Sequence, residues 1–213
     1  MNTDELVTLL ASRAEALDPR APARRYGVAV ALGAVAAILL TAALLGLRRS
    51  LVDDLAVPMF WAKELFCLAL AGAGVLVVRR LARPGAKLGL APLAMVLPVL
   101  ALWLLAGYVL YTAEPGARAQ LVLGHTASVC PFLIALVAAP LFAAFMWSLR
   151  DLAPTRLRLA GAAGGFAAGA MGALVYSLHC PELAAPFVGI WYVLGILVPT
   201  LVGTWLGPRL LRW

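Results

Sequence analysis

The chain has 213 residues, of which 64% are hydrophobic and only 13% are charged, and its formal net charge is +7. A soluble domain has about 45–50% apolar and about 25% charged residues, so this composition excludes a soluble globular protein and indicates an integral membrane protein. The positive charge requires no nucleic-acid partner, because lysine and arginine gather in the cytoplasmic loops of membrane proteins and contact anionic lipid headgroups.

The first 25 residues predict a short amphipathic helix followed by a tether. Thr3 can cap the start of a helix, with Asp4 and Glu5 in its first turn. Leucines then follow at helical spacing: Leu6, Leu9, Leu10 and Leu17. Asp18 precedes a proline and ends the pattern. The acidic character of this helix favours a groove in a protein partner over an anionic membrane surface, although binding to a membrane surface remains the alternative.

Six apolar runs of about 20 residues follow, and each is long enough to cross a hydrocarbon core of ~30 Å as a helix. They are residues 26–47, 58–78, 88–111, 122–149, 157–178 and 186–206. The fourth run is longer than a span requires, so its helix should begin near Ser128 or Pro131. The predicted fold class is therefore all-α: a polytopic bundle of six transmembrane helices, with the short amphipathic helix in front of it.

The basic residues predict the orientation of this bundle. Thirteen fall on the side of the N-terminus: Arg13, Arg20, Arg24, Arg25, Arg79, Arg80, Arg83, Lys87, Arg150, Arg156, Arg158, Arg209 and Arg212. Three fall on the other side, namely Arg48, Arg49 and Arg118. Lysine and arginine in short loops mark the cytoplasmic side. We therefore expect both termini to be cytoplasmic, and the acidic residues before the first apolar run argue against a cleavable signal peptide.

The fifth run contains a face of small residues, with Gly161, Gly165 and Gly169 at intervals of four. Such a face allows two helices to approach closely in a membrane. The pattern does not distinguish packing within one chain from packing between two copies, so a homo-oligomer is one alternative.

Both histidines and two of the three cysteines lie in the outer loops or at their edges. They are His125, Cys130, His179 and Cys180. Thiolates and imidazoles are ligands for soft or borderline metal ions, so these four residues are candidates for one metal site. Cys130 and Cys180 could instead form a disulfide in an oxidising compartment. A third alternative is that the four residues are unpaired at the membrane interface, and the sequence leaves all three open.

The remaining chemistry-bearing residues give little support for an enzyme. Cys67 lies inside the second span, where a free cysteine commonly behaves as a small hydrophobic residue. Lys63 and Glu64 lie near the outer end of that span, where Lys63 is expected to snorkel to the interface or to pair with a loop carboxylate. None of the familiar nucleophile, metalloprotease or dithiol motifs is present. A small membrane transporter or thiol-redox protein that uses Lys63, Glu64 and the outer cysteines is the alternative function.

Segments from the whole chain carry a family resemblance. They are TDELVTLLA near the N-terminus, HTASVCPF and LHCPELAAPFVGIWYVLG around the outer cysteines, and the closing GPRLLRW. PMFWAKELF and RRLARPG are weaker parts of the same likeness. Together with the six spans, these segments resemble the NrsF family of membrane-bound anti-sigma factors, which restrain extracytoplasmic-function (ECF) sigma factors of the SigF type in Gram-negative bacteria.

The resemblance implies a protein of the bacterial inner membrane with two parts. Residues 1–25 would bind the sigma factor, and residues 26–213 would form the transmembrane sensor. We expect the sigma factor to contact Leu6, Val7, Leu9, Leu10 and Leu17. The family's paired cysteines match Cys130 and Cys180, and the family is associated with metal or oxidant stress. A signal there would alter the packing of spans 4 to 6. No cofactor is required, although a soft metal ion could bind transiently, and no direct nucleic-acid contact is expected.

Overall fold

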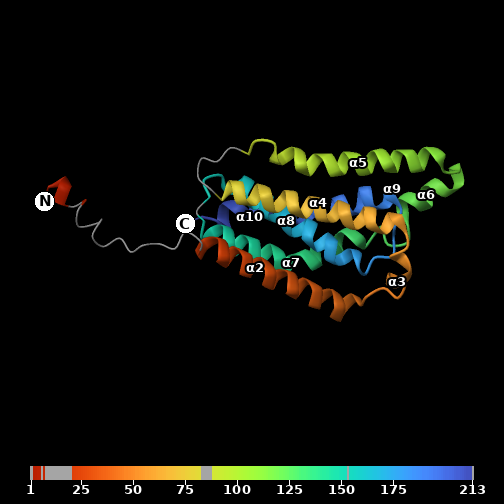
Figure 1. Cartoon of the computed structure of the whole chain (residues 1–213), viewed down its shortest axis with the longest axis horizontal. Coiled ribbons are helices and arrows are strands. Elements are labelled where there is room, and N and C mark those ends of the chain that lie inside the picture. Colours follow the sequence, from red (N-terminus) through yellow and green to blue (C-terminus); the bar gives the residue numbers. More distant parts are fainter. Residues whose placement is uncertain (1, 6, 8–20, 83–87, 153, 213) are drawn as a thin grey trace.

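The computed structural model describes residues 2–5, 7, 21–82, 88–152 and 154–212, and every regular element in this part of the chain is a helix (Figure 1). The elements are α2 (Ala21–Leu40), η1 (Thr41–Leu45), α3 (Leu51–Asp54), α4 (Pro58–Leu81), α5 (Ala91–Thr112), α6 (Pro115–Leu123), α7 (Cys130–Arg150), α8 (Leu157–Ser177), α9 (Ala185–Phe187), η2 (Val188–Tyr192) and α10 (Val193–Leu210). The two η elements are π-helical turns that continue directly from, or into, α-helices.

The six predicted spans are confirmed as six helices that are long and apolar enough to cross a membrane. They are α2 with η1, α4, α5, α7, α8, and the continuous helix of α9, η2 and α10. The fourth begins at Cys130, between the two starting points that the sequence predicts. Prolines in the first turns of α4, α6 and α7 explain these starts, because proline fits where the N–H has no helical partner.

The segment between the third and fourth spans contains a helix of its own, α6. Pro115 begins this helix, and Gly124 ends it with a positive φ of 51°. This combination of an initial proline and a terminal glycine is a sequence signal for a helix, and its short length makes it easy to overlook within a loop.

Helix α8 occupies the centre of the bundle and packs against α4, α7 and α10. Its small residues permit this position. A side chain at Gly161 would collide with the backbone of Gly203 on α10, and one at Gly165 would collide with that of Pro199. The small-residue face therefore serves packing inside one chain, which answers the question that the sequence left open.

Helices α5 and α2 lie at the edge of the bundle and expose much of their apolar surface. Only Ala91, Leu102 and Ala106 are buried in α5. This helix is tied to the bundle by Trp103, whose Nε1 donates to the carbonyl of Gly189 in η2 at 2.9 Å. An apolar surface of this extent is what a lipid-facing helix presents.

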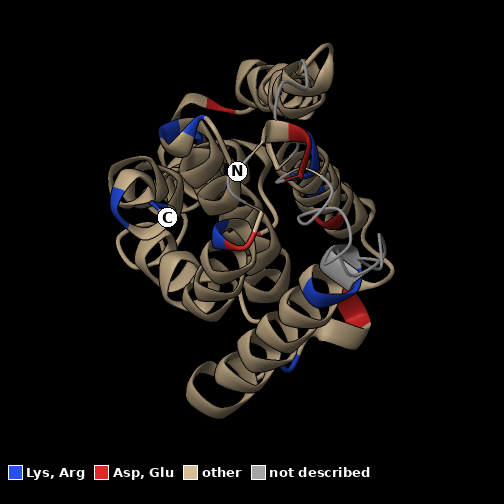
Figure 2. Cartoon of the chain, turned by 90° about the vertical axis from the view of Figure 1, so that its left-hand side faces the viewer, with Lys and Arg blue, Asp and Glu red and all other residues tan. Residues whose placement is uncertain are grey.

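The bundle has two unlike ends. We call the end with loops 46–57, 113–129 and 178–184 the cysteine end, and the end where α2 begins and α10 finishes the arginine end (Figure 1). Figure 2 looks onto the arginine end and shows its basic residues around the rim. Those that the structure describes are Arg24, Arg25, Arg79, Arg80, Arg150, Arg156, Arg158, Arg209 and Arg212, and all nine are exposed.

The N-terminal segment is described only in part. Residues 3–5 and 7 are helical, and Val7 is exposed. The other four residues expected to contact a sigma factor lie outside the described residues: Leu6, Leu9, Leu10 and Leu17.

Candidate functional site

The structure brings Cys130 and Cys180 together at the cysteine end. Cys130 is the first residue of α7, and its N–H donates to the carbonyl of Thr126 at 2.9 Å. Cys180 lies in the turn after α8, and its N–H donates to the carbonyl of Tyr176 at 3.1 Å. Both side chains are 0% exposed. The two thiols share a hydrogen bond and are not joined by a disulfide.

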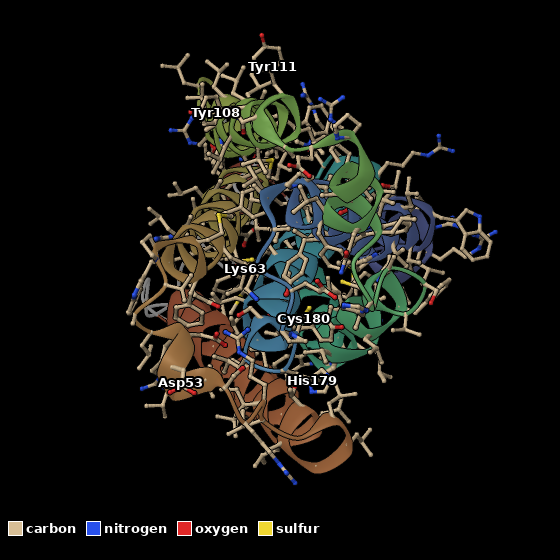
Figure 3. The ribbon with its side chains drawn as sticks, turned by 90° about the vertical axis from the view of Figure 1, so that its right-hand side faces the viewer. Asp53, Lys63, Tyr108, Tyr111, His179 and Cys180 are labelled. Atoms are coloured by element: carbon tan, nitrogen blue, oxygen red, sulfur yellow. The ribbon has the colours of Figure 1, made fainter. Side chains whose placement is uncertain are left out.

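Lys63 forms one wall of this site. Its side chain is 0% exposed, and its Nζ points toward the turn after α8 (Figure 3). Nζ donates to the carbonyls of Cys180 at 3.1 Å and Glu182 at 3.2 Å, and it lies 3.5 Å from that of Ser177. It also lies 5.7 Å from the centre of the Tyr192 ring. The expectation that Lys63 snorkels to the interface or pairs with a loop carboxylate is therefore wrong, because main-chain carbonyls surround its ammonium group within the protein.

Arg48 approaches the same turn from the other side. Its Nη1 donates to the Cys180 carbonyl at 2.9 Å, so this one oxygen accepts hydrogen bonds from two cationic side chains. Nε lies 3.1 Å from Oδ2 of Asp54, and the guanidinium lies 5.2 Å from the centre of the Phe60 ring. The side chain of Arg48 is only 4% exposed. Hydrogen bonds from charged donors are roughly twice as strong as neutral ones, so this carbonyl is held firmly.

The two histidines do not join the cysteines. The Nδ1 of His179 donates to the carbonyl of Gly46 at 2.9 Å, which directs the ring toward the end of η1 (Figure 3). The backbone N–H of His125 donates to Oε1 of Glu182 at 2.6 Å. Among the described residues, no three His, Cys, Asp or Glu side chains are grouped so as to hold a metal ion. The predicted metal site of His125, Cys130, His179 and Cys180 is therefore not assembled in this structure.

The surroundings of Cys180 favour its thiolate form. A hydrogen bond from the Cys130 thiol is the largest influence and lowers the pKa of the Cys180 thiol to about 5, from an ordinary value of about 8.5. The N–H of Glu182 and the charge of Lys63 act in the same direction, whereas burial opposes them. The thiolate is the form that attacks oxidants and binds soft metals, so Cys180 is chemically the more reactive member of the pair.

The shell around the two cysteines is aromatic and apolar. Tyr176 and Tyr192 are buried beside them, with ring centres 6.0 Å apart. The Trp191 indole donates to the carbonyl of Val122 at 2.8 Å and so ties the end of α6 to η2. Cys67 is also 0% exposed and packs in the same cluster, in agreement with its predicted role as a small hydrophobic residue.

The family described as "Negative regulator of sigma F" matches residues 10–213. The chain belongs to the NrsF family. Two NrsF relatives align over the full length of both chains: a probable anti-sigma-F factor of Azospira oryzae, 50% identical, and the anti-sigma-F factor of Caulobacter vibrioides, 39% identical. No solved structure matches the chain.

The range matched by the NrsF family contains some of the expected site residues and excludes others. Both cysteines, Leu10 and Leu17 lie inside the matched range, whereas Leu6, Val7 and Leu9 precede it. The two relatives cover all of the chain, including its first nine residues. A regulatory family agrees with the sequence-based expectation of a regulatory rather than a catalytic role.

Proposed function

We propose that this chain is a membrane-bound anti-sigma factor that holds an ECF sigma factor of the SigF type at the cytoplasmic face of the bacterial inner membrane and releases it when Cys130 and Cys180 react with an oxidant or a soft metal. The observation that carries the proposal is the meeting of these two cysteines from separate loops, at the end of the bundle opposite the start of α2 (Figure 1). The names of the relatives supply the sigma factor as partner.

The chemistry of the cysteine pair suits such a signal. With peroxide, the Cys180 thiolate attacks an oxygen, and the resulting sulfenic acid condenses with the Cys130 thiol to form the disulfide and water. With a soft metal, the Cys130 thiol loses its proton and both sulfurs bind the ion. Either product replaces the hydrogen bond between the thiols by a covalent or coordinate link, and the two loops must adjust to it.

The energetic requirement of the switch is within reach of this chemistry. A change from 1:99 to 99:1 in a two-state equilibrium needs about 5.5 kcal/mol of differential stability. A disulfide contributes roughly 2–4 kcal/mol, and a metal site of thiolates can contribute more. A metal site can therefore supply the full change, whereas a disulfide alone supplies part of it and shifts the equilibrium by a smaller factor.

The proposed orientation follows from the charges. With the arginine end in the cytoplasm, the N-terminal segment faces the sigma factor and the cysteine end faces the compartment outside the inner membrane. All nine described arginines of the arginine end then lie where cations are retained. The leucine stripe of the N-terminal segment would dock on the sigma factor through Leu6, Val7, Leu9, Leu10 and Leu17.

Sigma retention in membranes tests both halves of the proposal. Membranes with the full chain and a SigF-type sigma factor are treated with cadmium or peroxide, and the sigma factor left on the membrane is measured. We expect Cys130→Ala and Cys180→Ala to retain it, whereas the wild type and the control Cys67→Ala release it. Release from the Cys130→Ala, Cys180→Ala double variant at the wild-type level would refute sensing by the pair.

Separate variants test whether the N-terminal segment docks on the sigma factor. Leu9→Glu with Leu10→Glu places charges on the predicted leucine stripe and should free the sigma factor without any inducer. Thr8→Glu is the matched control, because Thr8 falls on the opposite face of the helical pattern predicted from the sequence. Full retention of the sigma factor by the double leucine variant would show that it docks elsewhere.

A further inference from the structure

The outer end of the first span is joined directly to the cysteine turn. Arg48 follows η1 and binds the Cys180 carbonyl through Nη1, while its own N–H lies 3.4 Å from the carbonyl of Leu178. The carbonyl of Gly46 accepts the hydrogen bond from His179. Three consecutive residues of the turn, 178–180, are thus bound by Gly46 and Arg48, which follow η1. We call Arg48, Lys63 and the Cys180 carbonyl the Cys180 clamp.

The other end of the first span leads to the N-terminal segment. α2 begins at the arginine end, immediately after the residues expected to bind the sigma factor (Figure 1). Along its length α2 packs mainly on α7, the helix that begins at Cys130. The contacts include Gly33 against Leu141 and an edge-to-face pair of Tyr26 and Phe145 with ring centres 5.8 Å apart. The first span therefore connects the two ends of the protein and touches the supports of both cysteines.

The first span is also held less firmly than the centre of the bundle. In its most apolar stretch 22% of the residues are buried, compared with 67% in α8. A helix with few buried side chains can shift at a lower cost than one enclosed on all sides, because fewer packing contacts must be broken. α8, whose glycines are locked against α10, is a poor candidate for such movement.

We propose that Arg48 and Lys63 are positioning residues that couple the state of Cys180 to the first span, so that α2 carries the signal to the N-terminal segment. This inference rests on the proposed function and names the helix that transmits its signal. A disulfide to Cys130 removes the thiolate charge of Cys180 beside Lys63, and a bound metal ion offsets that charge. Either link draws the turn toward α7. The Cys180 carbonyl then leaves its place between the two cations, and the end of η1 is released with it.

The clamp gives a testable difference between two adjacent arginines. Arg48 is buried in the clamp, whereas Arg49 is exposed. Arg48→Gln removes a charged hydrogen-bond donor from a buried acceptor, so opening of the cysteine turn should increase roughly ten- to hundredfold. Arg49→Gln should leave it unchanged. Lys63→Met should open the turn at least as far as Arg48→Gln, since its Nζ binds more than one carbonyl.

Two measurements on the full chain in membranes test the proposal. The first is the rate at which N-ethylmaleimide alkylates Cys180, resolved from Cys67 and Cys130 by mass spectrometry, because a buried thiol reacts only when the turn opens. The second is the fraction of a SigF-type sigma factor that sediments with the membranes without inducer. We expect Arg48→Gln to accelerate alkylation and to lower the retained fraction, and Arg49→Gln to match the wild type in both.

A milder variant keeps the proposal testable if Arg48→Gln does not fold. Asp54→Asn removes the charge that lies 3.1 Å from Arg48 Nε but keeps the side-chain shape. It should give a smaller change in the same direction in both measurements. Lys63→Arg retains a cation and should restore part of the protection that Lys63→Met loses.

The outcomes separate this inference from the proposed function. If Arg48→Gln and Asp54→Asn accelerate alkylation but retain the sigma factor and its release by cadmium or peroxide, the clamp does not carry the signal and this inference fails alone. If neither variant changes the alkylation rate, the clamp does not hold the turn and the inference also fails. If Cys130→Ala and Cys180→Ala respond to cadmium and peroxide like the wild type, the proposed function fails instead.

Discussion

The two ends of the bundle use the same kind of residue in opposite ways. At the arginine end, all nine described arginines are exposed. At the cysteine end, two of the four cations, Arg48 and Lys63, are enclosed and bind the Cys180 carbonyl. The arginines of the first group face lipid and solvent, whereas Arg48 and Lys63 are enclosed and hold the turn after α8.

This difference bears on the proposed orientation of the bundle. A count of cations by sequence already favours the arginine end as cytoplasmic. Because Arg48 and Lys63 are internal, only Arg49 and Arg118 remain as exposed cations at the cysteine end. Among the described residues, nine exposed cations at the arginine end face two at the cysteine end, which is the same direction of asymmetry as in the sequence count.

The largest expected effect concerns this orientation. In a background with all three cysteines replaced by alanine, Arg49→Cys should label fully with a membrane-impermeant maleimide added to intact, outer-membrane-permeabilised cells. Arg156→Cys at the opposite end should label only after the inner membrane is broken, because a charged reagent cannot cross it. The opposite result would invert the topology and remove the N-terminal segment from the compartment that contains sigma factors.

The second largest expected effect is a loss of stability. It compares the replacement of a buried cation with the replacement of an exposed one. Lys63→Met leaves the Glu182 carbonyl without the Lys63 donor and removes one of the two cationic donors to the Cys180 carbonyl, and an unsatisfied buried acceptor costs about 1–3 kcal/mol. We expect a loss of about 3 kcal/mol in the free energy of unfolding, measured by thermal denaturation in detergent. Arg156→Gln at the arginine end should change it by less than ~0.5 kcal/mol. Equal losses in the two variants would contradict the distinction between the ends.

The sequence predicts the spans well for a physical reason. Each helix must be apolar along about 20 residues to cross the bilayer, so composition alone marks the six segments, and the start of α7 falls within the predicted interval. It also predicts that Cys130 and Cys180 share one end of the bundle. It cannot predict that they touch, because their distance depends on how α6 and the turn after α8 fold over that end.

The positions of Lys63 and the histidines could not be predicted from the sequence in the way that the spans could. Lys63 lies about one turn into α4, which fits a snorkelling side chain, but its acceptors are main-chain carbonyls of a turn more than 110 residues away. Every residue has a carbonyl, so no sequence pattern marks these acceptors. His179 likewise looks like a metal ligand by residue type, although its partner is the carbonyl of Gly46.

The third effect is a pH dependence at the cysteine end. The pKa of Cys180 is lowered to about 5, so the thiolate's contribution to docking of the turn is complete above the ordinary thiol pKa and is lost as pH falls through about 5. The alkylation rate of Cys180 should therefore be nearly constant between about pH 6 and 9, where a free thiol of pKa about 8.5 would change steeply.

Replacing Cys130 tests the cause of that lowered pKa. The hydrogen bond from Cys130 is its largest source, so Cys130→Ala should move the midpoint of the alkylation profile from about 5 toward the ordinary value of about 8.5. Cys67→Ala is the control and should leave the midpoint in place. A profile of the Cys130→Ala variant that coincides with the wild type would mean that Lys63 and the Glu182 N–H determine the pKa without Cys130.

The smallest expected effect is a change in stability. It compares Gly124, which ends α6, with Gly116, which lies within that helix. Gly124 has a φ of 51°, and a Cβ there would lie 2.7 Å from the carboxylate carbon of Glu182. Gly124→Ala should therefore destabilise the protein by about 1–2 kcal/mol, through backbone strain and displacement of the carboxylate that binds His125 N–H. The cost should appear in thermal denaturation and in faster exchange of the His125 amide hydrogen.

Gly116 lies in the same helix with nothing within 4 Å of an added Cβ. Gly116→Ala should stabilise the protein by about 0.5–1 kcal/mol, because alanine loses less backbone entropy than glycine when a helix forms. Opposite signs for two glycine-to-alanine changes eight residues apart would show that the cysteine end is fitted around Glu182 and its neighbours. If both changes were neutral, Glu182 would not hold α6 against the cysteine turn.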